Sequence, residues 1–384
     1  MANSLKYNRL IDLSDISRKS LFLFGPRQTG KSTLLKSLYP DSPLVNLLMS
    51  DQFLKYQLNP RAFREEILTE SNRLPIIVDE IQKLPILLDE IHYLIENHSY
   101  RFILTGSSAR KLRRESSNLL AGRALERRLF PLVTREIGQY DINRIINFGS
   151  LPAIYDSPDP EEDLFSYVGS YLKEEIQQES NIRKLGPFAN FLEQAALDNS
   201  ELLNFANIAS DVGVSANTVK EYYQILEDTL IGTFLPPFKR TIKRKAISKA
   251  KFYFFDVGVA NILAKRLNIK PKSELYEKCL EHLVYVELKA WLSYSRNRQS
   301  LTFWRSINGQ EVDFIIGNEI AIEVKSTTRV QGKHLKGIKA LAEEVPLTHK
   351  IIISLDNKKR IMDDNFIIYP VKDFFAELWA NKIF

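Results

Sequence analysis

The chain has 384 residues, of which 44% are hydrophobic and 26% charged, and it carries a net charge of +6. This length predicts two or three domains, and the composition is that of a soluble globular protein and excludes a low-complexity chain. A sequence pI near 9.0 favours a polyanionic partner.

The N-terminal sequence and the cysteine content bear on location. The opening stretch, MANSLKYNRLIDLSDISRKS, has no apolar region typical of a signal peptide, and no run approaches the roughly 18 apolar residues of a membrane span. The single cysteine, Cys279, cannot form an intrachain disulfide, which suits a reducing compartment. We therefore expect a cytoplasmic protein without membrane association.

The first predicted strand leads directly into a glycine-rich loop. The sequence SLFLF is followed by GPRQTGKS and then by the helix-like run TLLKSLY. This is the G-x-x-x-x-G-K-[ST] pattern in a strand–loop–helix context, in which backbone N–H groups surround the β-phosphate of a nucleotide. Lys31 is expected to reach the β- and γ-phosphates, and Ser32 to bind Mg²⁺. The expected nucleotide-binding residues are Gly25, Pro26, Arg27, Gln28, Thr29, Gly30, Lys31, Ser32 and Thr33.

Two further predicted strands end in polar residues. PIIVDE ends in Asp79, expected to hold Mg²⁺ through water, and Glu80, expected to polarise the attacking water of ATP hydrolysis. RFILTGSS ends in hydroxyl residues, and parallel α/β sheets bind ligands at the carboxyl ends of their strands. Thr105 or Ser107, with Ser107 favoured, would touch the γ-phosphate or the water. Capping of the following turns is the alternative.

Four segments together carry a resemblance to a known family. They are GPRQTGKST, IIVDEIQKLP, ILTGSSARKL and LLAGRALERRLFPL, in this order. The chain resembles, over nearly its whole length, the AAA+ ATPases of bacteria and archaea that have a C-terminal winged-helix and nuclease-like region. The resemblance implies an α/β fold with a P-loop parallel sheet, ATP and Mg²⁺ as ligands, and a homo-oligomer.

The same resemblance bears on the fourth segment, which contains Arg123. In the family this Gly-Arg lies near the subunit boundary, so Arg123 is the first choice for an arginine finger that stabilises charge on the γ-phosphate of a neighbouring subunit. Arg110, Arg127 and Arg128 are the other choices, and an ion pair with an acid is the structural alternative for Arg123. No arginine stands out as the sensor of a closing lid.

The middle of the chain is predicted to be helical and to contain a helix-turn-helix. In NFANIASDVGVSANTVKEYYQILED the small and branched residues have the spacing of that motif, and Ser215 caps the second helix. The outward positions of the second helix are Asn217, Lys220, Glu221 and Gln224. Base reading and a packing or hinge role both remain open, because the nearby acids repel phosphates.

A basic segment, residues 239–251, follows the helix-turn-helix. In a winged helix this segment would be the wing or the adjoining loop, and its cations would contact the backbone of DNA. A solvated charge run is the alternative. The cations of the segment, which contains no acid, are Lys239, Arg240, Lys243, Arg244, Lys245, Lys249 and Lys251.

The segment GQEVDFIIGNEIAIEVKS predicts a β-hairpin with a three-residue turn over residues 317–319. Ile316 then faces Ile320, and Asp313 faces Glu323. Alternation puts the acids and Lys325 on one face and the apolar residues on the other. The apolar set expected on that other face is Val312, Phe314, Ile316, Ile320, Ile322 and Val324.

The polar face of this hairpin suits metal-dependent phosphodiester cleavage. Asp313 and Glu323 would bind Mg²⁺ or Mn²⁺, and Lys325 would activate the water or stabilise the phosphate. The hairpin resembles that of PD-(D/E)XK nucleases, which implies a third metal ligand from a preceding helix. Glu281 has the matching place, with Glu287 as the alternative. An ordinary hairpin with salt bridges on its polar face is the structural alternative.

These predictions divide the chain into an AAA+ ATPase core (1–140), a helical lid with a winged helix (141–255) and a mixed α/β nuclease-like domain (256–384). The predicted function is ATP hydrolysis coupled to the binding or remodelling of DNA. The alternative is an ATP-dependent assembly switch whose nuclease-like domain is an inactive scaffold for DNA or protein.

Overall fold

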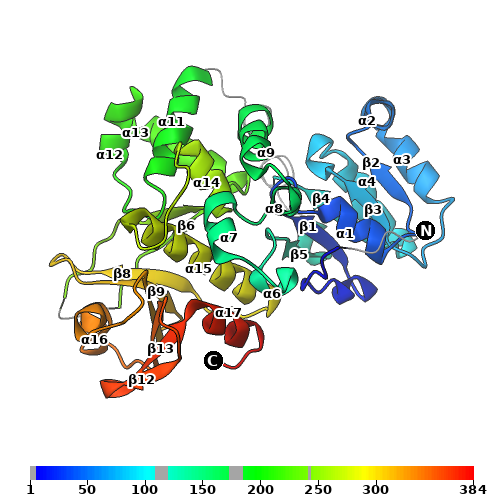
Figure 1. The fold of residues 1–384 in the computed structure, drawn as a ribbon. Helices are drawn as coiled ribbons and strands as arrows, with labels where there is room; N and C mark the ends of the chain where they lie inside the picture. The colour runs from blue at the N-terminus through cyan, green and yellow to red at the C-terminus, as the bar shows by residue number, and fades with distance from the viewer. Residues whose placement is uncertain (1–5, 109–119, 173–184, 241–243) are drawn as a thin grey trace. The chain divides into compact units, whose positions relative to one another are not determined.

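A computed structural model describes residues 6–108, 120–172, 185–240 and 244–384 (Figure 1). Two compact units are present. The first contains the chain up to Leu132 together with Asp228–Ile231, and the second begins at Val133 and contains most of the remaining chain. Arg110 and Lys243 lie outside the described residues, so their predicted roles stay predictions.

The first unit is built on a five-stranded parallel sheet in the order β2-β3-β4-β1-β5. The central strands are apolar and buried on both faces, as is usual in parallel sheets. The carboxyl ends of β1, β3 and β4 therefore meet at one edge, as predicted. The strands are β1 (Ser20–Phe24), β2 (Leu44–Asn46), β3 (Ile76–Asp79), β4 (Phe102–Gly106) and β5 (Ala124–Arg128).

Helices pack against this sheet and supply much of its core. Leu34 and Leu35 of the first helix are buried, and the fourth helix contributes Leu87, Leu88, Ile91 and Leu94. The α-helices of the unit are α1 (Lys31–Leu38), α2 (Ser50–Leu58), α3 (Pro60–Ile67) and α4 (Leu87–His98), and the 3₁₀ turns are η1 (Ser14–Ser17), η2 (Ile81–Lys83) and η3 (Leu120–Gly122).

The second unit begins with helices and contains the predicted helix-turn-helix in α12 and α13. Gly213 between them has a φ of 74°, which favours glycine, and the Ser215 hydroxyl accepts from the Thr218 N–H at 3.1 Å, which confirms the predicted cap. The helices are α6 (Thr134–Ile137), α7 (Ile142–Phe148), α8 (Pro152–Asp156), α9 (Pro160–Ser166), the π-helix η4 (Tyr167–Leu172), α11 (Leu185–Leu197), α12 (Phe205–Val212), α13 (Ala216–Asp228) and α14 (Val257–Leu263).

An antiparallel pair, β6 (Gly232–Leu235) and β7 (Lys251–Phe254), follows the helix-turn-helix. The loop between these strands runs along the edge strand β8 (Leu301–Arg305): the Phe238 N–H donates to the Phe303 carbonyl at 2.6 Å, and the Ile247 N–H donates to the Arg305 carbonyl at 2.8 Å. The β6–β7 loop, whose described residues are 236–240 and 244–250, is therefore attached along this edge of the C-terminal sheet on both sides of its undescribed part.

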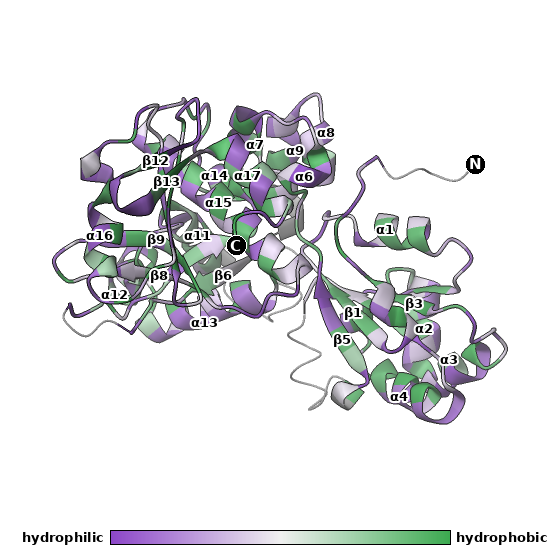
Figure 2. Cartoon of the chain, turned by 90° about the horizontal axis from the view of Figure 1, so that it is seen from below, coloured by the Kyte–Doolittle hydropathy of each residue, from purple (hydrophilic) through white to green (hydrophobic). Residues whose placement is uncertain are grey.

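The C-terminal sheet is six-stranded and mixed, in the order β12-β13-β11-β10-β9-β8. Helices α15 and α17 pack on one face and α16 on the other, and apolar residues run along the strands (Figure 2). The remaining elements are α15 (Glu274–Tyr294), β9 (Glu311–Ile316), β10 (Ile320–Lys325), η5 (Gly332–Leu335), α16 (Lys336–Ala342), β11 (His349–Ser354), β12 (Arg360–Met362), η6 (Asp363–Asn365), β13 (Phe366–Pro370) and α17 (Val371–Trp379).

Candidate nucleotide site and carboxylate cluster

The glycine-rich loop lies between β1 and the first turn of α1, and its backbone is strongly curved. Gln28 and Gly30 have positive φ angles of 61° and 93°. A Cβ on Gly25 would approach the Leu129 carbonyl oxygen to 2.4 Å, so no larger residue fits there without a shift of the backbone. The loop thus has the curvature that phosphate-binding loops require.

Lys31 is buried at the start of α1, and its side chain lies over the loop. Its ammonium donates to the carbonyl oxygens of Gly25 at 2.7 Å and Pro26 at 3.1 Å. The buried Thr29 hydroxyl also donates to Pro26 O, at 2.8 Å. The cation is therefore held beside the loop, where the oxygens of a phosphate are stronger acceptors than these carbonyls.

The predicted magnesium ligands lie together. The Ser32 hydroxyl donates to Asp79 Oδ2 at 2.8 Å, and the Thr105 hydroxyl donates to the other oxygen, Oδ1. A hydroxyl beside a carboxylate offers the hard oxygen ligands that Mg²⁺ prefers. These residues therefore fit the metal, and Thr105 fixes the carboxylate that would hold it through water.

Glu80 and Ser107 form a second pair at the same edge of the sheet. The Ser107 hydroxyl lies 3.3 Å from Glu80 Oε2, while the Glu80 N–H donates to Thr105 Oγ1 at 3.1 Å. The sequence does not decide whether Thr105 or Ser107 belongs to the site. In the structure both contact one of its carboxylates: Thr105 contacts Asp79, and Ser107 contacts Glu80.

Arg9, which belongs to none of the sequence motifs, also contacts the loop. Its guanidinium donates to the carbonyl of Thr29 at 2.6 Å and to that of Phe130 at 2.6 Å. The N-terminal segment thereby ties the phosphate loop to the end of β5. No local pattern reveals such a contact, because Arg9 and Phe130 are 121 residues apart.

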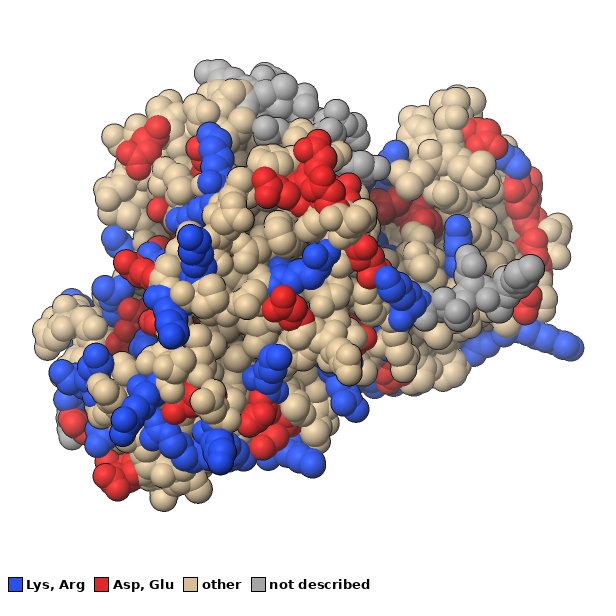
Figure 3. All heavy atoms as spheres, viewed as in Figure 1, with Lys and Arg blue, Asp and Glu red and all other residues tan. Residues whose placement is uncertain are grey.

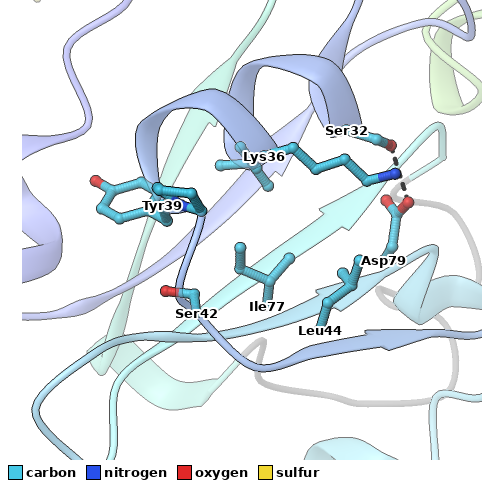
Figure 4. A pocket seen from close by; sticks show the side chains of 9 residues that line it. Ser32, Lys36, Tyr39, Ser42, Leu44, Ile77 and Asp79 are labelled. Atoms are coloured by element: carbon cyan, nitrogen blue, oxygen red, sulfur yellow. Dashed lines mark hydrogen bonds between the residues drawn. The ribbon is translucent and has the colours of Figure 1, made fainter. Parts of the chain in front are cut away.

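A pocket of about 280 Å³ opens beside Ser32 and Asp79 (Figure 4). It lies between α1 and the strands β2 and β3, and its walls are largely apolar. The residues that line it are Ser32, Leu35, Lys36, Tyr39, Pro40, Ser42, Leu44, Ile77 and Asp79.

Two of the arginines predicted as fingers, Arg123 and Arg127, have acidic partners within the first unit. Arg123 forms an ion pair with Glu96, and Arg127 pairs with Asp15. The pair with Glu96 is the structural alternative foreseen for Arg123. In this conformation the Arg123 guanidinium is bound to Glu96 at the surface of its own subunit. Its role as an arginine finger stays a prediction.

The register of the C-terminal hairpin is confirmed. Ile320 pairs with Ile316 and Ile322 with Phe314, so the turn contains three residues. The Val324 N–H donates to the Asp313 carboxylate at 2.8 Å, which joins the acid of one strand to the end of the other.

The expected division into one apolar and one polar face holds only in part. Phe314, Ile316, Ile320, Ile322 and Val324 lie together in one buried cluster, as predicted, whereas Val312 does not join them. Val312 packs with Ile315 and Ala321 in a second buried cluster, beneath α16. The cause is a bulge: between the pairs Thr302–Ile315 and Trp304–Val312, β9 advances one residue more than β8. A bulge reverses the alternation of side chains beyond it. The bulge therefore accounts for the position of Val312. The face opposite Phe314 is buried as well, because Ile315 and Ala321 pack with residues of α16, and the acids lie at one end of the sheet.

Lys251 lies among these acids. The residue is 3% exposed, and its ammonium contacts Glu281 at 3.0 Å and Glu311 at 2.8 Å. The Tyr253 hydroxyl also donates to Glu281. Burial alone would lower the pKa of Lys251, but Glu281, Glu311 and Asp313 raise it above its ordinary value. Desolvation raises the pKa of Glu281 to about 7.

Glu323 and Lys325 form the other half of this carboxylate cluster. Lys325 pairs with Glu323 at 2.8 Å, and burial, with Asp313 second, raises the pKa of Glu323 well above its usual range. Across the described residues, no three acidic, histidine or cysteine side chains are placed to hold a metal ion together. The predicted set of Glu281, Asp313 and Glu323 is thus not assembled as a metal site, and metal binding there stays a prediction.

Glu287, the alternative helix glutamate, has other partners. Its carboxylate accepts from the Thr134 N–H at 2.7 Å and from the Trp379 indole at 2.5 Å. Burial raises its pKa to about 7. Glu287 therefore ties α6 to α15 and α17.

The basic segment contributes fewer surface cations than the sequence predicts. Lys251 is buried, and Arg244 pairs with Glu343 at 2.6 Å and with Glu344 at 3.2 Å. The exposed cations described in this segment are Lys239, Arg240, Lys245 and Lys249. Lysines and arginines also gather over α16 and the neighbouring strands (Figure 3).

The parallel sheet, the phosphate loop and the carboxylates at the strand ends have the arrangement of a P-loop domain. Three family models match successive parts of the chain: an AAA domain over residues 17–138, a domain of unknown function (DUF8612) over 139–273, and a second one (DUF4143) over 276–374. An AAA domain in general binds ATP with Mg²⁺ and hydrolyses it.

The relatives come from bacteria and archaea. An uncharacterized protein of Mycobacterium tuberculosis is 24% identical over 320 residues, which cover 80% of this chain and 70% of the relative. One of Methanocaldococcus jannaschii is 24% identical over 350 residues (81% and 75%), and one of Haemophilus influenzae is 23% identical over 367 residues (85% and 88%). No described helix combines the length and apolar character needed to cross a bilayer.

Proposed function

We propose that the chain is a Mg²⁺-dependent ATP hydrolase of the AAA+ class that couples turnover to the binding or remodelling of DNA. The observation that carries the proposal is the bonded pair Ser32–Asp79 beside the Lys31 ammonium and the Glu80 carboxylate. These groups are the hydroxyl, acid, cation and base that phosphoryl transfer to water requires.

Each group has a distinct task. Lys31 leaves the carbonyls of Gly25 and Pro26 to neutralise charge on the β- and γ-phosphates. Ser32 would hold Mg²⁺ directly and Asp79 would hold it through water, and the bound metal would withdraw charge from the phosphate oxygens. Glu80 accepts a proton from the attacking water.

The exposed cations Lys239, Arg240, Lys245 and Lys249 support DNA as the partner, because they lie along a loop attached to the edge of a sheet. The test is the rate of ATP hydrolysis with and without duplex or branched DNA. Stimulation by DNA is the expected result. A slow rate that DNA leaves unchanged would contradict the coupling.

A second function, an ATP-dependent switch with an inactive C-terminal scaffold, is favoured by the position of Lys251. An ammonium among Glu281, Glu311 and Asp313 supplies the positive charge that a metal would bring to a nuclease. Measuring DNA cleavage in the same reactions, with Mg²⁺ or Mn²⁺ present, separates an active nuclease from an inactive scaffold. DNA cleavage that Asp313→Ala abolishes supports a nuclease, and intact DNA supports the scaffold.

A homo-oligomer with Arg123 acting between subunits is part of the proposal. Arg123→Ala should lower turnover with little change in ATP affinity. Mixing this variant with inactive Glu80→Gln subunits should restore part of the activity, since mixed interfaces contain one intact site. No recovery at any ratio, with assembly confirmed by light scattering, would leave Arg123 as the partner of Glu96.

A further inference from the structure

Gln82 lies in the turn η2, directly after the two acids of β3. Glu80, at the start of this turn, has the left-handed backbone angles φ 61° and ψ 47°. The Gln82 side chain contacts Glu80 and Ser107, at the ends of β3 and β4. It is 1% exposed, so its polar atoms need partners inside the protein or at the site.

The amide nitrogen of Gln82 uses both of its hydrogens. It donates to Glu80 Oε2 at 2.5 Å and to Ser107 Oγ at 3.0 Å. The reverse orientation of the amide would put its oxygen against the Glu80 carboxylate, acceptor against acceptor. The network therefore sets which end of the amide faces Glu80.

The amide oxygen, in contrast, is buried and has no hydrogen-bond partner among the described residues. It lies over Gly106 at the end of β4, where a Cβ would come within 2.7 Å of it. Buried acceptors are nearly always bonded, so this unpaired acceptor, in the same amide that contacts the Glu80 carboxylate, calls for a small donor.

We propose that Gln82 is a second water-positioning residue of the hydrolytic site: its amide nitrogen orients Glu80 and Ser107, and its amide oxygen accepts one hydrogen of the attacking water while Glu80 accepts the other. The inference rests on the proposed ATPase function and deepens it. Two acceptors would fix both hydrogens of the water and leave a lone pair free to attack.

Atoms and electrons balance in this step. The water oxygen forms a bond to the γ-phosphorus, and the bond from the γ-phosphorus to the β,γ-bridging oxygen breaks. Its electron pair leaves with ADP. The proton of the water passes to Glu80, and Gln82 exchanges no proton.

The test uses Gln82→Met, which keeps the volume of the side chain and removes both polar atoms. Gln57→Met, on an exposed face of α2, is the matched control. We expect kcat to fall roughly tenfold to hundredfold, with KM and the Kd of ATP within about threefold of the wild type. The affinity for ADP with Mg²⁺ and aluminium fluoride, which imitates the reacting phosphate with its water, should fall by a similar factor.

A double-mutant cycle with Glu80→Gln separates positioning from folding. If both residues act on one water, the double variant should be hardly slower than Glu80→Gln alone. Independent, additive losses, or parallel losses of ATP affinity and melting temperature, would overturn the proposal. An unchanged kcat in Gln82→Met would also overturn the proposal. A higher kcat would do so too, because it would mean that Gln82 holds Glu80 away from its catalytic position. A wild type that neither binds nor hydrolyses ATP would overturn the proposed function as well.

Discussion

Arg9 donates from one guanidinium to two carbonyls, those of Thr29 and Phe130, and so holds the phosphate loop from outside the motif. Hydrogen bonds from a charged donor each contribute about 1.5–3 kcal/mol. Part of that free energy keeps the loop in its curved form before a nucleotide arrives.

Arg9→Met should therefore weaken ATP binding by roughly tenfold and lower the melting temperature, because it removes both hydrogen bonds. Arg9→Lys should recover part of the affinity, since one ammonium can donate to either carbonyl but lacks the rigid fork. Equilibrium binding of ATP checks both, with Arg61→Met, an exposed substitution next to Glu65, as control. Undiminished affinity in Arg9→Met would remove Arg9 from the site.

Glu287 predicts a pH dependence of stability. Its pKa is raised from 4.5 to about 7 by burial, so the folded protein binds its proton more tightly than the unfolded chain does. Stability from this group is complete below about pH 4.5 and is lost as the pH rises towards 7, a change on the order of 3 kcal/mol.

Glu287→Gln removes this titration. The melting temperature of the variant minus that of the wild type should increase as the pH rises from 5 to 8. The substitution can also shift the melting temperature by a constant amount, which does not affect this trend. Glu274→Gln, at an exposed position of the same helix, is the control and should show no such trend. If the difference in melting temperature between the variant and the wild type stays constant from pH 5 to 8, Glu287 does not titrate in this range and the prediction is contradicted.

Among the structural elements, the β6–β7 loop carries the test of DNA binding. Replacing Lys239, Arg240, Lys245 and Lys249 by glutamine should weaken binding to duplex DNA irrespective of sequence. The slope of log K against log salt should fall by about 0.9 for each phosphate that the variant no longer neutralises. Fluorescence anisotropy at several salt concentrations measures both.

The matched control removes four lysines near α14 and α15: Lys265, Lys270, Lys272 and Lys278. This variant has the same net charge as the loop variant, so a general loss of attraction would affect both equally. Equal affinities and slopes for the two variants would contradict the assignment of the loop as the DNA-binding surface.

Patterns confined to a few neighbouring residues were predictable from the sequence. The phosphate loop between 25 and 32, the acids ending β3 and the hairpin turn at 317–319 depend on local backbone geometry, and the structure has them where expected. The Ser215 cap belongs to the same group.

Features that depend on distant pairing were not predictable. The bulge in β9 arises from its register with β8, and it moves Val312 to the other face of the sheet. The sequence predicts Lys251 as a surface cation because its neighbours are basic, whereas its partners Glu281 and Glu311 lie 30 and 60 positions further along the chain. A run of basic residues in the sequence shows how many cations a segment contains. Only the fold shows which of those cations form ion pairs.

At the scale of the whole molecule, an AAA domain precedes two domains of unknown function over residues 17–374, and the relatives of M. jannaschii and H. influenzae align with 81% and 85% of the chain. ATP turnover is the central claim, because the proposed action on DNA depends on it. A boundary near 140, another near 255 and a homo-oligomeric assembly stay predictions.

The most direct test measures ATP affinity and turnover on the same preparations of the wild type, Lys31→Ala and Glu80→Gln, with Lys55→Ala as a surface control. The proposal predicts that Lys31→Ala loses affinity, and that Glu80→Gln binds ATP as the wild type does but turns over at least about a hundredfold more slowly, since only proton transfer from the water is removed. Wild-type turnover in Glu80→Gln, or a wild type that does not bind ATP with Mg²⁺, would contradict it.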